Sequence, residues 1–182
     1  MTTHHRAVEA GQPARQSSAT PWLHLEQSIT IARPVSAVFA YAGAYENDPA
    51  WRSGVVEMVQ DPAGIPTVGA TTREVLRVFG RRQVTVAEVV AYEPDRRTAF
   101  VSLGGSTPVR GSRHFEACAA GTRFSYELEL ARTGLVRLLG PVLVRSLNRD
   151  LARSLRRLKG LLDDGREHSP TSGGLRRVAS PR

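Results

Sequence analysis

The sequence has few of the residues that build metal centres and disulfide frameworks. Among its 182 residues there are one cysteine, Cys118, and five histidines. A single cysteine excludes an intramolecular disulfide. Apart from the adjacent His4 and His5, the histidines are not clustered as metal ligands usually are. We therefore expect no metal and no cofactor in this protein.

Membrane spans, signal peptides and phosphate-binding loops are also missing. No apolar run approaches the ~20 residues that cross a bilayer, and the first residues lack the hydrophobic core of a signal peptide. Gly104-Gly105 lies in a turn between predicted strands, whereas a phosphate-binding loop joins a strand to a helix. No Ser-His-acid or Cys-His arrangement can be placed along the chain. We expect a cytoplasmic protein, and no motif decides whether it is an enzyme.

Most of the chain carries almost no net charge. The net charge of +8 comes almost wholly from arginine, because Lys159 is the single lysine. Residues 22–132 carry twelve arginines and twelve acidic residues, whereas 133–164 have a net charge of +4 and 165–182 a net charge of +3. This distribution argues against a nucleic-acid partner that covers the whole surface.

Composition divides the chain into three parts. Residues 1–21 and 165–182 are rich in small and polar residues and lack apolar periodicity, so we expect a disordered leader and a disordered basic tail. Hydrophobic residues make up 41% of the sequence, which is enough for one sizeable core. We expect a single domain at residues 22–164, and the sequence leaves its oligomeric state open.

Within this domain the spacing of apolar residues predicts strands and helices in a definite order. Apolar residues alternate from Leu23 to Ile31, as in a half-buried strand, and then recur at helical spacing after Pro34. Residues 46–51, which end at Trp51, are predicted to form a second short turn of helix or a loop. Six further strands are predicted at residues 55–59, 71–79, 82–92, 98–103, 109–117 and 122–130.

A long amphipathic helix is predicted after Pro141. Its apolar face consists of Leu143, Leu147, Leu151, Leu155, Leu158 and Leu162. Its opposite face centres on Arg145, Arg149, Arg153 and Arg156. The leucine face should be buried against the sheet. A break is expected near Gly140, because proline disturbs the preceding turn of a helix.

Four stretches carry a resemblance to a known superfamily, namely residues 29–34 followed by Val38-Phe39, residues 47–51, residues 92–97 and residues 121–124. With these stretches in this order, residues 22–164 resemble the START-like or Bet v 1-like (SRPBCC) superfamily, in particular its bacterial polyketide cyclase/dehydrase and lipid-transport branch. The resemblance implies an α+β helix-grip fold. In that fold a strand, two helices, six strands and a long helix follow one another, and a curved antiparallel sheet of about seven strands wraps the last helix.

The resemblance also implies a cavity between sheet and helix that binds an apolar small molecule of lipid, polyketide or isoprenoid type. We favour a carrier or sensor. The alternative is a polyketide cyclase or dehydratase that uses polar groups of the cavity as acid and base. A third hypothesis takes Arg145, Arg149 and Arg153 as a contact surface for an anionic membrane, RNA or an acidic protein, against the simpler alternative of a solvated helix face.

Strand alternation predicts which side chains line this cavity. We expect an apolar lining with few polar groups, consisting of Trp51, Arg113, Phe115, Phe124, Tyr126, Leu128, Leu147 and Leu151. Because a buried charge needs a partner, Arg113 either orients a ligand or lies at the cavity mouth, paired with a carboxylate such as Glu74. The Tyr126 hydroxyl either contacts a ligand or donates to a backbone carbonyl, and Trp51 either covers the core or contacts a ligand. His114 should point outward.

Overall fold

A computed structural model describes residues 22–78, 80–104, 107–133 and 140–164. The predictions for residues 1–21 and 165–182, and for a break or kink of the helix in the residues just before 140, lie outside the described residues. Within the described part no helix is both long enough and apolar enough to cross a membrane.

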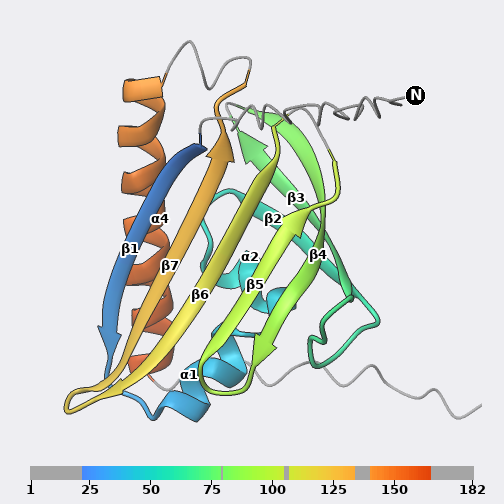
Figure 1. The fold of residues 1–182 in the computed structure, drawn as a ribbon. Helices are drawn as coiled ribbons and strands as arrows, with labels where there is room; N and C mark the ends of the chain where they lie inside the picture. The colour runs from blue at the N-terminus through green and yellow to red at the C-terminus, as the bar shows by residue number, and fades with distance from the viewer. Residues whose placement is uncertain (1–21, 79, 105–106, 134–139, 165–182) are drawn as a thin grey trace, which may run out of the picture.

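The described strands form one seven-stranded antiparallel sheet, as predicted (Figure 1). They are β1 (Trp22–Ile31), β2 (Val55–Asp61), β3 (Thr71–Val78), β4 (Arg81–Glu93), β5 (Arg97–Ser102), β6 (Val109–Cys118) and β7 (Gly121–Ala131). Their order across the sheet is β1-β7-β6-β5-β4-β3-β2, so β1 and β2 form its two edges.

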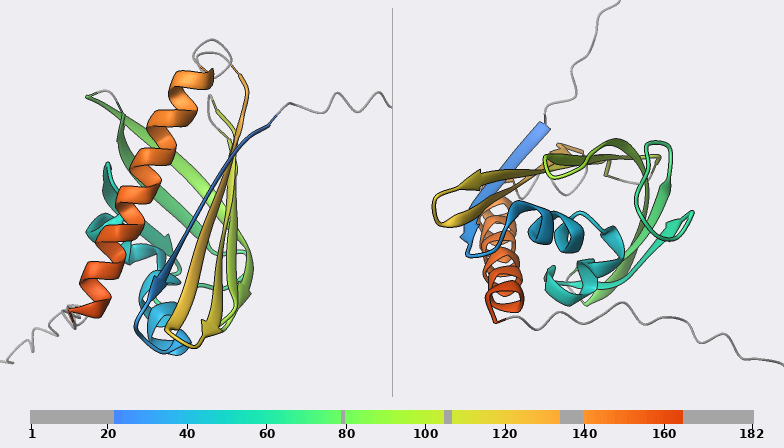
Figure 2. Two further views of the ribbon diagram at one scale, coloured as in Figure 1. Left: turned by 90° about the vertical axis from the view of Figure 1, so that its left-hand side faces the viewer. Right: turned by 90° about the horizontal axis from the view of Figure 1, so that it is seen from below.

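Helices occupy the concave side of this sheet. In the described residues they are α1 (Val35–Ala42), the 3-10 turn η1 (Tyr45–Asn47), α2 (Asp48–Trp51) and α4 (Gly140–Asp163). Figure 2 shows the sheet curving around α1 and α2, with α4 running along its open side. The predicted sequence of elements is therefore confirmed.

The inward-pointing side chains of β6 and β7 form part of the core. Phe124 and Tyr126 point inward with 0% exposure, and across the ladder they pair with Phe115 and Arg113. Phe39 of α1 packs edge-on against Phe115, with ring centroids 4.9 Å apart. These inward aromatic side chains join α1 to the centre of the sheet.

The β6–β7 turn depends on one glycine. Gly121 has a φ of +121°, which side chains with a Cβ rarely adopt, and a Cβ there would collide with the backbone oxygen of Ile31 at the end of β1. The turn can therefore approach the end of β1 closely only with glycine at this position.

The helix α4 divides into two halves. Four leucines of its C-terminal half are at most 6% exposed and lie in the core, namely Leu151, Leu155, Leu158 and Leu162. Lys159 Nζ donates to the carbonyl of Thr30 at 2.8 Å, and the Ala32 N–H donates to Asp163 Oδ1 at 2.9 Å. The C-terminal half is thus fixed to β1, whereas Leu143 and Leu147 in the N-terminal half are only half-buried.

Candidate functional site

A cavity of about 520 Å³ lies between the sheet and α4. Small-molecule sites usually measure ~300–1,000 Å³. All seven strands of the described sheet contribute to its wall, together with η1, the residues after α2, and α4. The lining residues are Leu25, Tyr45, Arg52, Ser53, Met58, Thr72, Glu74, Leu76, Gln83, Thr85, Ala87, Phe100, Thr107, Val109, Leu128, Leu130, Leu143, Leu147, Asp150, Leu151 and Ser154.

Much of the apolar wall comes from α4 and from the β1-β7-β6 half of the sheet. Its members there are Leu25, Val109, Leu128, Leu130, Leu143, Leu147 and Leu151. On the strands these residues occupy inward positions of the alternating pattern, and on α4 they are the first part of the leucine stripe. This wall suits an apolar ring or chain, because burial removes such a surface from water.

The other half of the sheet supplies a polar wall. Thr72 and Glu74 of β3 lie beside Thr85 and Gln83 of β4, and Glu74 is the direct cross-strand partner of Thr85. The lining is therefore mixed, and the prediction of few polar groups is wrong. The cause is that the alternation along β4 is inverted: Val84 and Val86 are 50% and 42% exposed on the outer face, whereas Gln83 and Thr85 line the cavity, so the hydrophobic pattern alone indicates the wrong inward face.

Four charged side chains form a buried group beside the polar wall, which we call the ionic quartet: Asp48, Arg52, Glu74 and Arg113. Arg113 Nη2 donates to Asp48 Oδ2 at 2.6 Å, and both side chains are 0% exposed. Arg52 Nη1 donates to the same Asp48 oxygen at 2.9 Å and also to Glu74 Oε2. Two positive and two negative groups therefore balance each other where water cannot screen them.

Aromatic rings surround the cations of the quartet. The Arg113 guanidinium carbon lies 4.6 Å from the ring centre of Tyr45, 5.1 Å from that of Tyr126 and 5.3 Å from that of Trp51. Arg113 Nη1 also donates to the backbone carbonyl of Ala42 at 2.7 Å. Ring faces and a carbonyl stabilise the buried charge further.

Burial raises the pKa of the Tyr126 and Tyr45 hydroxyls, although the nearby arginine charge acts in the opposite direction. Both phenols therefore stay protonated at neutral pH. Burial by itself would lower the pKa of Arg52, but Glu74 and Asp48 outweigh it and leave that pKa well above its ordinary value. The pKa of Arg113 is raised in the same way, chiefly by Asp48. Both arginines are fixed cations.

The structure separates the eight predicted site residues into two groups. Leu128, Leu147 and Leu151 line the cavity. The other five lie in the packed interior, at most 5% exposed and outside that lining: Trp51, Arg113, Phe115, Phe124 and Tyr126. Inward alternation on a strand identified the buried face, but it could not tell which inward positions meet helices and which meet the cavity.

The alternatives for Arg113 and Tyr126 are resolved differently from what we expected. Arg113 is fully buried and pairs with Asp48, while Glu74 pairs with Arg52. The Tyr126 hydroxyl has no hydrogen-bond partner among the described residues, so it does not donate to a backbone carbonyl. His114 is half-exposed on the outer face, as predicted. Sequence named Glu74 as a carboxylate at the cavity mouth but gave it Arg113 as its partner, and it missed Arg52 and Asp48; the available signal for Arg52 was its position directly after Trp51.

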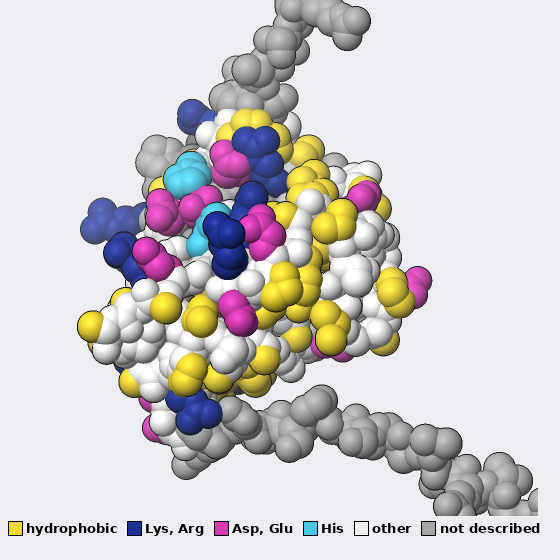
Figure 3. Space-filling model, turned by 60° about the horizontal axis from the view of Figure 1, so that its bottom comes forward, with side chains coloured by type: hydrophobic (Ala, Val, Ile, Leu, Met, Phe, Trp, Pro, Cys, Tyr) yellow, Lys and Arg dark blue, Asp and Glu magenta, His cyan; other side chains and the backbone are white. Residues whose placement is uncertain are grey.

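The outer face of the sheet brings together a serine, a histidine and an acid. Figure 3 shows histidine side chains (cyan) beside acidic ones (magenta) on this surface. Ser112 Oγ lies 3.0 Å from His114 Nε2 and donates to Glu127 Oε2 at 3.1 Å. Glu127 Oε1 is 3.7 Å from the same histidine nitrogen. In a catalytic triad the acid contacts the other ring nitrogen, so this group lacks triad geometry. Among the described residues no group of three or more histidine, cysteine or acidic side chains is placed to hold a metal.

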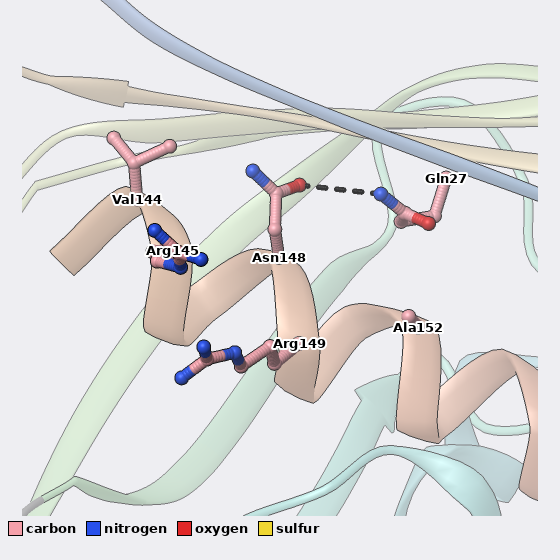
Figure 4. A pocket seen from close by; sticks show the side chains of 6 residues that line it. All are labelled: Gln27, Val144, Arg145, Asn148, Arg149 and Ala152. Carbon is pink, nitrogen blue, oxygen red and sulfur yellow. Dashed lines mark hydrogen bonds between the residues drawn. The ribbon is translucent and has the colours of Figure 1, made fainter. Parts of the chain in front are cut away.

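A second hollow of about 490 Å³ lies on the surface between α4 and β1. Figure 4 shows Gln27 of β1 reaching Asn148 of α4, with Nε2 and Oδ1 3.4 Å apart, while Arg145 and Arg149 extend from the same helix. Both arginines are exposed. This groove is open and cationic, in contrast to the cavity on the other side of the helix.

Solved structures with a similar fold come from several sources. A protein from Thermus thermophilus is 18% identical, with a TM-score of 0.65 over 80% of this chain and 99% of that chain. A START superfamily protein from Mycobacterium smegmatis is 12% identical, with a TM-score of 0.62 over 78% and 97%. The di-domain ARO/CYC StfQ from the steffimycin biosynthetic pathway is 15% identical, with a TM-score of 0.65 over 80% and 52%. A comparison with curated protein sequences finds no match.

The curved sheet, the long helix and the cavity between them define a helix-grip protein of the START-like and Bet v 1-like class. The likeness to these solved structures shows the fold alone. The sequence match is more specific: residues 23–163 match the family described as polyketide cyclase/dehydrase and lipid transport, and the chain belongs to that family. The predicted resemblance and fold class are thereby confirmed.

Proposed function

We propose that the protein binds an apolar small molecule of lipid, polyketide or isoprenoid type between the sheet and α4, as a carrier or a sensor. The observation that supports this most is the cavity of about 520 Å³. The half-buried Leu143 and Leu147 line it, so they have apolar surface that the protein itself leaves uncovered. Burying apolar surface is worth ~25 cal/mol per Å², and a ligand would supply that burial.

A cyclase or dehydratase is the alternative function, which the polar wall supports. Tyr45 and Glu74 bring a phenol and a carboxylate to the lining, which can donate or accept a proton, and the Arg52 guanidinium beside them can stabilise negative charge that develops on a substrate. A carrier releases its ligand unchanged, whereas turnover that is lost in Tyr45→Phe would indicate the enzyme.

The cytoplasmic location stays a prediction.

Binding of N-phenyl-1-naphthylamine, a neutral dye that fluoresces in apolar surroundings, tests the proposed function. The parent protein should bind one dye in a saturable manner. Leu147→Trp puts an indole into the cavity and should weaken binding at least about tenfold, equivalent to ~1.4 kcal/mol. Val142→Trp, on the same helix but 74% exposed in the parent, is the matched control and should leave binding unchanged. Absence of binding by the parent, or equal binding by both variants, would contradict the proposal.

The arginine face of α4 supports a second proposal, contact with an anionic membrane surface. Arg145, Arg149 and Arg153 are exposed on the solvent side of the helix. Arg153 pairs with Asp150 at 2.9 Å, so part of its charge is neutralised locally. Arg145 and Arg149 beside the groove therefore carry most of this proposal, because each exposed arginine near an anionic bilayer adds about 1 kcal/mol of attraction.

A further inference from the structure

Two members of the ionic quartet reach the cavity, and two lie behind them. Arg52 and Glu74 line the cavity, with 12% and 14% of their side chains exposed. Asp48 and Arg113 are completely buried and do not belong to the lining. The quartet therefore has a cavity-facing pair and a supporting pair.

Arg52 keeps hydrogen-bond donors free. Both of its contacts to the quartet use one nitrogen, Nη1. Its Nη2 and Nε donate to no described residue, and neither is among the fully enclosed polar atoms of the described chain. Oε1 of Glu74 likewise accepts from no described residue. A donor group and an acceptor oxygen thus remain unused side by side on the cavity wall.

The supporting pair explains how Arg52 is held in position. Asp48 Oδ2 accepts from both arginines, and Arg113 is itself fixed by the Ala42 carbonyl and by the rings of Tyr45, Trp51 and Tyr126. A binding group is selective when the residues behind it fix its orientation. Arg113, which sequence suggested as the ligand-orienting arginine, instead acts through Asp48 as a positioning residue.

Stability alone does not account for four buried charges at this place. Apolar side chains of similar volume would often fill such a space at no loss of stability. The quartet also leaves Asp48 Oδ1 and Arg113 Nε buried without a hydrogen-bond partner among the described residues. These two atoms lie behind the lining, and the atoms that indicate ligand recognition are the unused ones of Arg52 and Glu74 that face the cavity.

We propose that Arg52 and Glu74 bind the polar end of the ligand, and that this end is an uncharged group with an acceptor oxygen next to a hydroxyl donor, such as a hydroxy-ketone. This proposal rests on the proposed function of the cavity. The quartet contains two cations and two anions, so a charged ligand group would add an uncompensated charge in surroundings that water screens poorly. A neutral donor and acceptor pair engages the free atoms without that penalty. The apolar remainder of the ligand then lies along Leu143, Leu147 and Leu128.

Three naphthalenes that differ only at one substituent test this proposal, each measured by displacement of N-phenyl-1-naphthylamine from the full chain. They are 2-(hydroxyacetyl)naphthalene, the similarly shaped hydrocarbon 2-sec-butylnaphthalene, and the anion 2-naphthylglyoxylate. The parent should bind the anion more weakly than the hydroxy-ketone. The double variant Arg52→Met/Glu74→Met should bind the hydroxy-ketone about tenfold more weakly, as expected for lost hydrogen bonds to charged groups, and the hydrocarbon within about twofold of the parent.

A matched control lies on the outer face of the sheet, opposite the cavity-facing side of β3 that carries Glu74. Arg73 and Glu57 of β3 and β2 form an exposed ion pair with Nη1 and Oε1 2.6 Å apart, and Arg73→Met/Glu57→Met should change none of the affinities. Glu74→Gln is the second variant and needs no large change in packing. It gives the quartet an excess positive charge and should strengthen binding of the anion relative to the hydroxy-ketone.

The possible failures are distinguishable. If the parent does not bind the dye, the proposed function fails and this inference fails with it. If the dye binds but the double variant weakens the hydroxy-ketone and the hydrocarbon equally, the Arg52–Glu74 pair does not recognise the polar end. If the parent binds the anion most tightly, or Glu74→Gln leaves the ratio of the two affinities unchanged, the requirement for an uncharged group is wrong.

Discussion

Asp48 is the residue on which the interior charges depend. It is fully buried, and one of its oxygens accepts from Arg113 at 2.6 Å and from Arg52 at 2.9 Å. Without its charge, Arg113 would be left completely buried with no carboxylate partner, and Arg52 would keep only Glu74. Removing one member of a buried ionic group is strongly unfavourable, because its partners keep their desolvation penalty and lose their attraction.

Asp48→Asn should therefore lower the free energy of unfolding by about 3–5 kcal/mol, measured by urea denaturation. Asp150→Asn is the matched control, because Asp150 pairs with Arg153 at an exposed position and its loss should change stability by less than ~1 kcal/mol. Equal effects of the two substitutions would show that the quartet is not the stabilising arrangement described here.

The members of the ionic quartet are only partly predictable from sequence. Strand alternation placed Arg113 inside, and the need of a buried charge for a partner predicted an acid beside it. The identity of that acid was not predictable, because Asp48 lies 65 positions away in a short helix whose placement depends on the packing of Trp51 and Tyr45. Arg52 was missed, and Glu74 was expected to pair with Arg113, for the same reason: long-range packing, not local pattern, brings Arg52 and Glu74 together.

At the scale of one element, the leucine face of α4 both packs into the core and lines the cavity. Its leucine periodicity predicted the buried face correctly, and Leu151 and Leu155 are 6% and 1% exposed. The same periodicity could not reveal that Leu143 and Leu147 line a cavity, because an apolar side chain is equally suited to a packed core and to an apolar ligand. The exposure of the arginine face was also predicted correctly, and its proposed role is contact with an anionic membrane.

Replacing Arg145, Arg149 and Arg153 with glutamine should leave the unfolding free energy within ~1 kcal/mol of the parent, since exposed charges contribute little to stability. If α4 contacts membranes, this triple variant should co-sediment less with phosphatidylglycerol vesicles, by about 1 kcal/mol for each arginine, and the parent's binding should fall as salt rises. Glutamine at the exposed Arg73, Arg81 and Arg82 of the sheet is the control. No binding by the parent at low salt, or an equal loss in the control, would contradict the membrane proposal.

At the scale of the whole molecule, the order of elements was predictable from local pattern, whereas a cavity was expected only from the resemblance to a known superfamily. Local hydrophobic periods predicted the order of strands and helices, and the resemblance to a known superfamily implied that they form the helix-grip arrangement. The cavity arises from the curvature of the sheet and from the position of α4 across it, and no local pattern encodes either one. That residues 22–164 fold independently of the flanking segments stays a prediction; the family match over residues 23–163 lies within these limits.

Native mass spectrometry of the full chain, purified from its own host, tests the central proposal most directly. The proposal predicts protein carrying one added mass, which organic extraction releases as a small molecule with an apolar body and an uncharged oxygen-bearing end. Leu147→Trp should reduce the occupied fraction, and Val142→Trp should not. Protein of bare mass that also takes up nothing from an extract of host lipids would contradict the account.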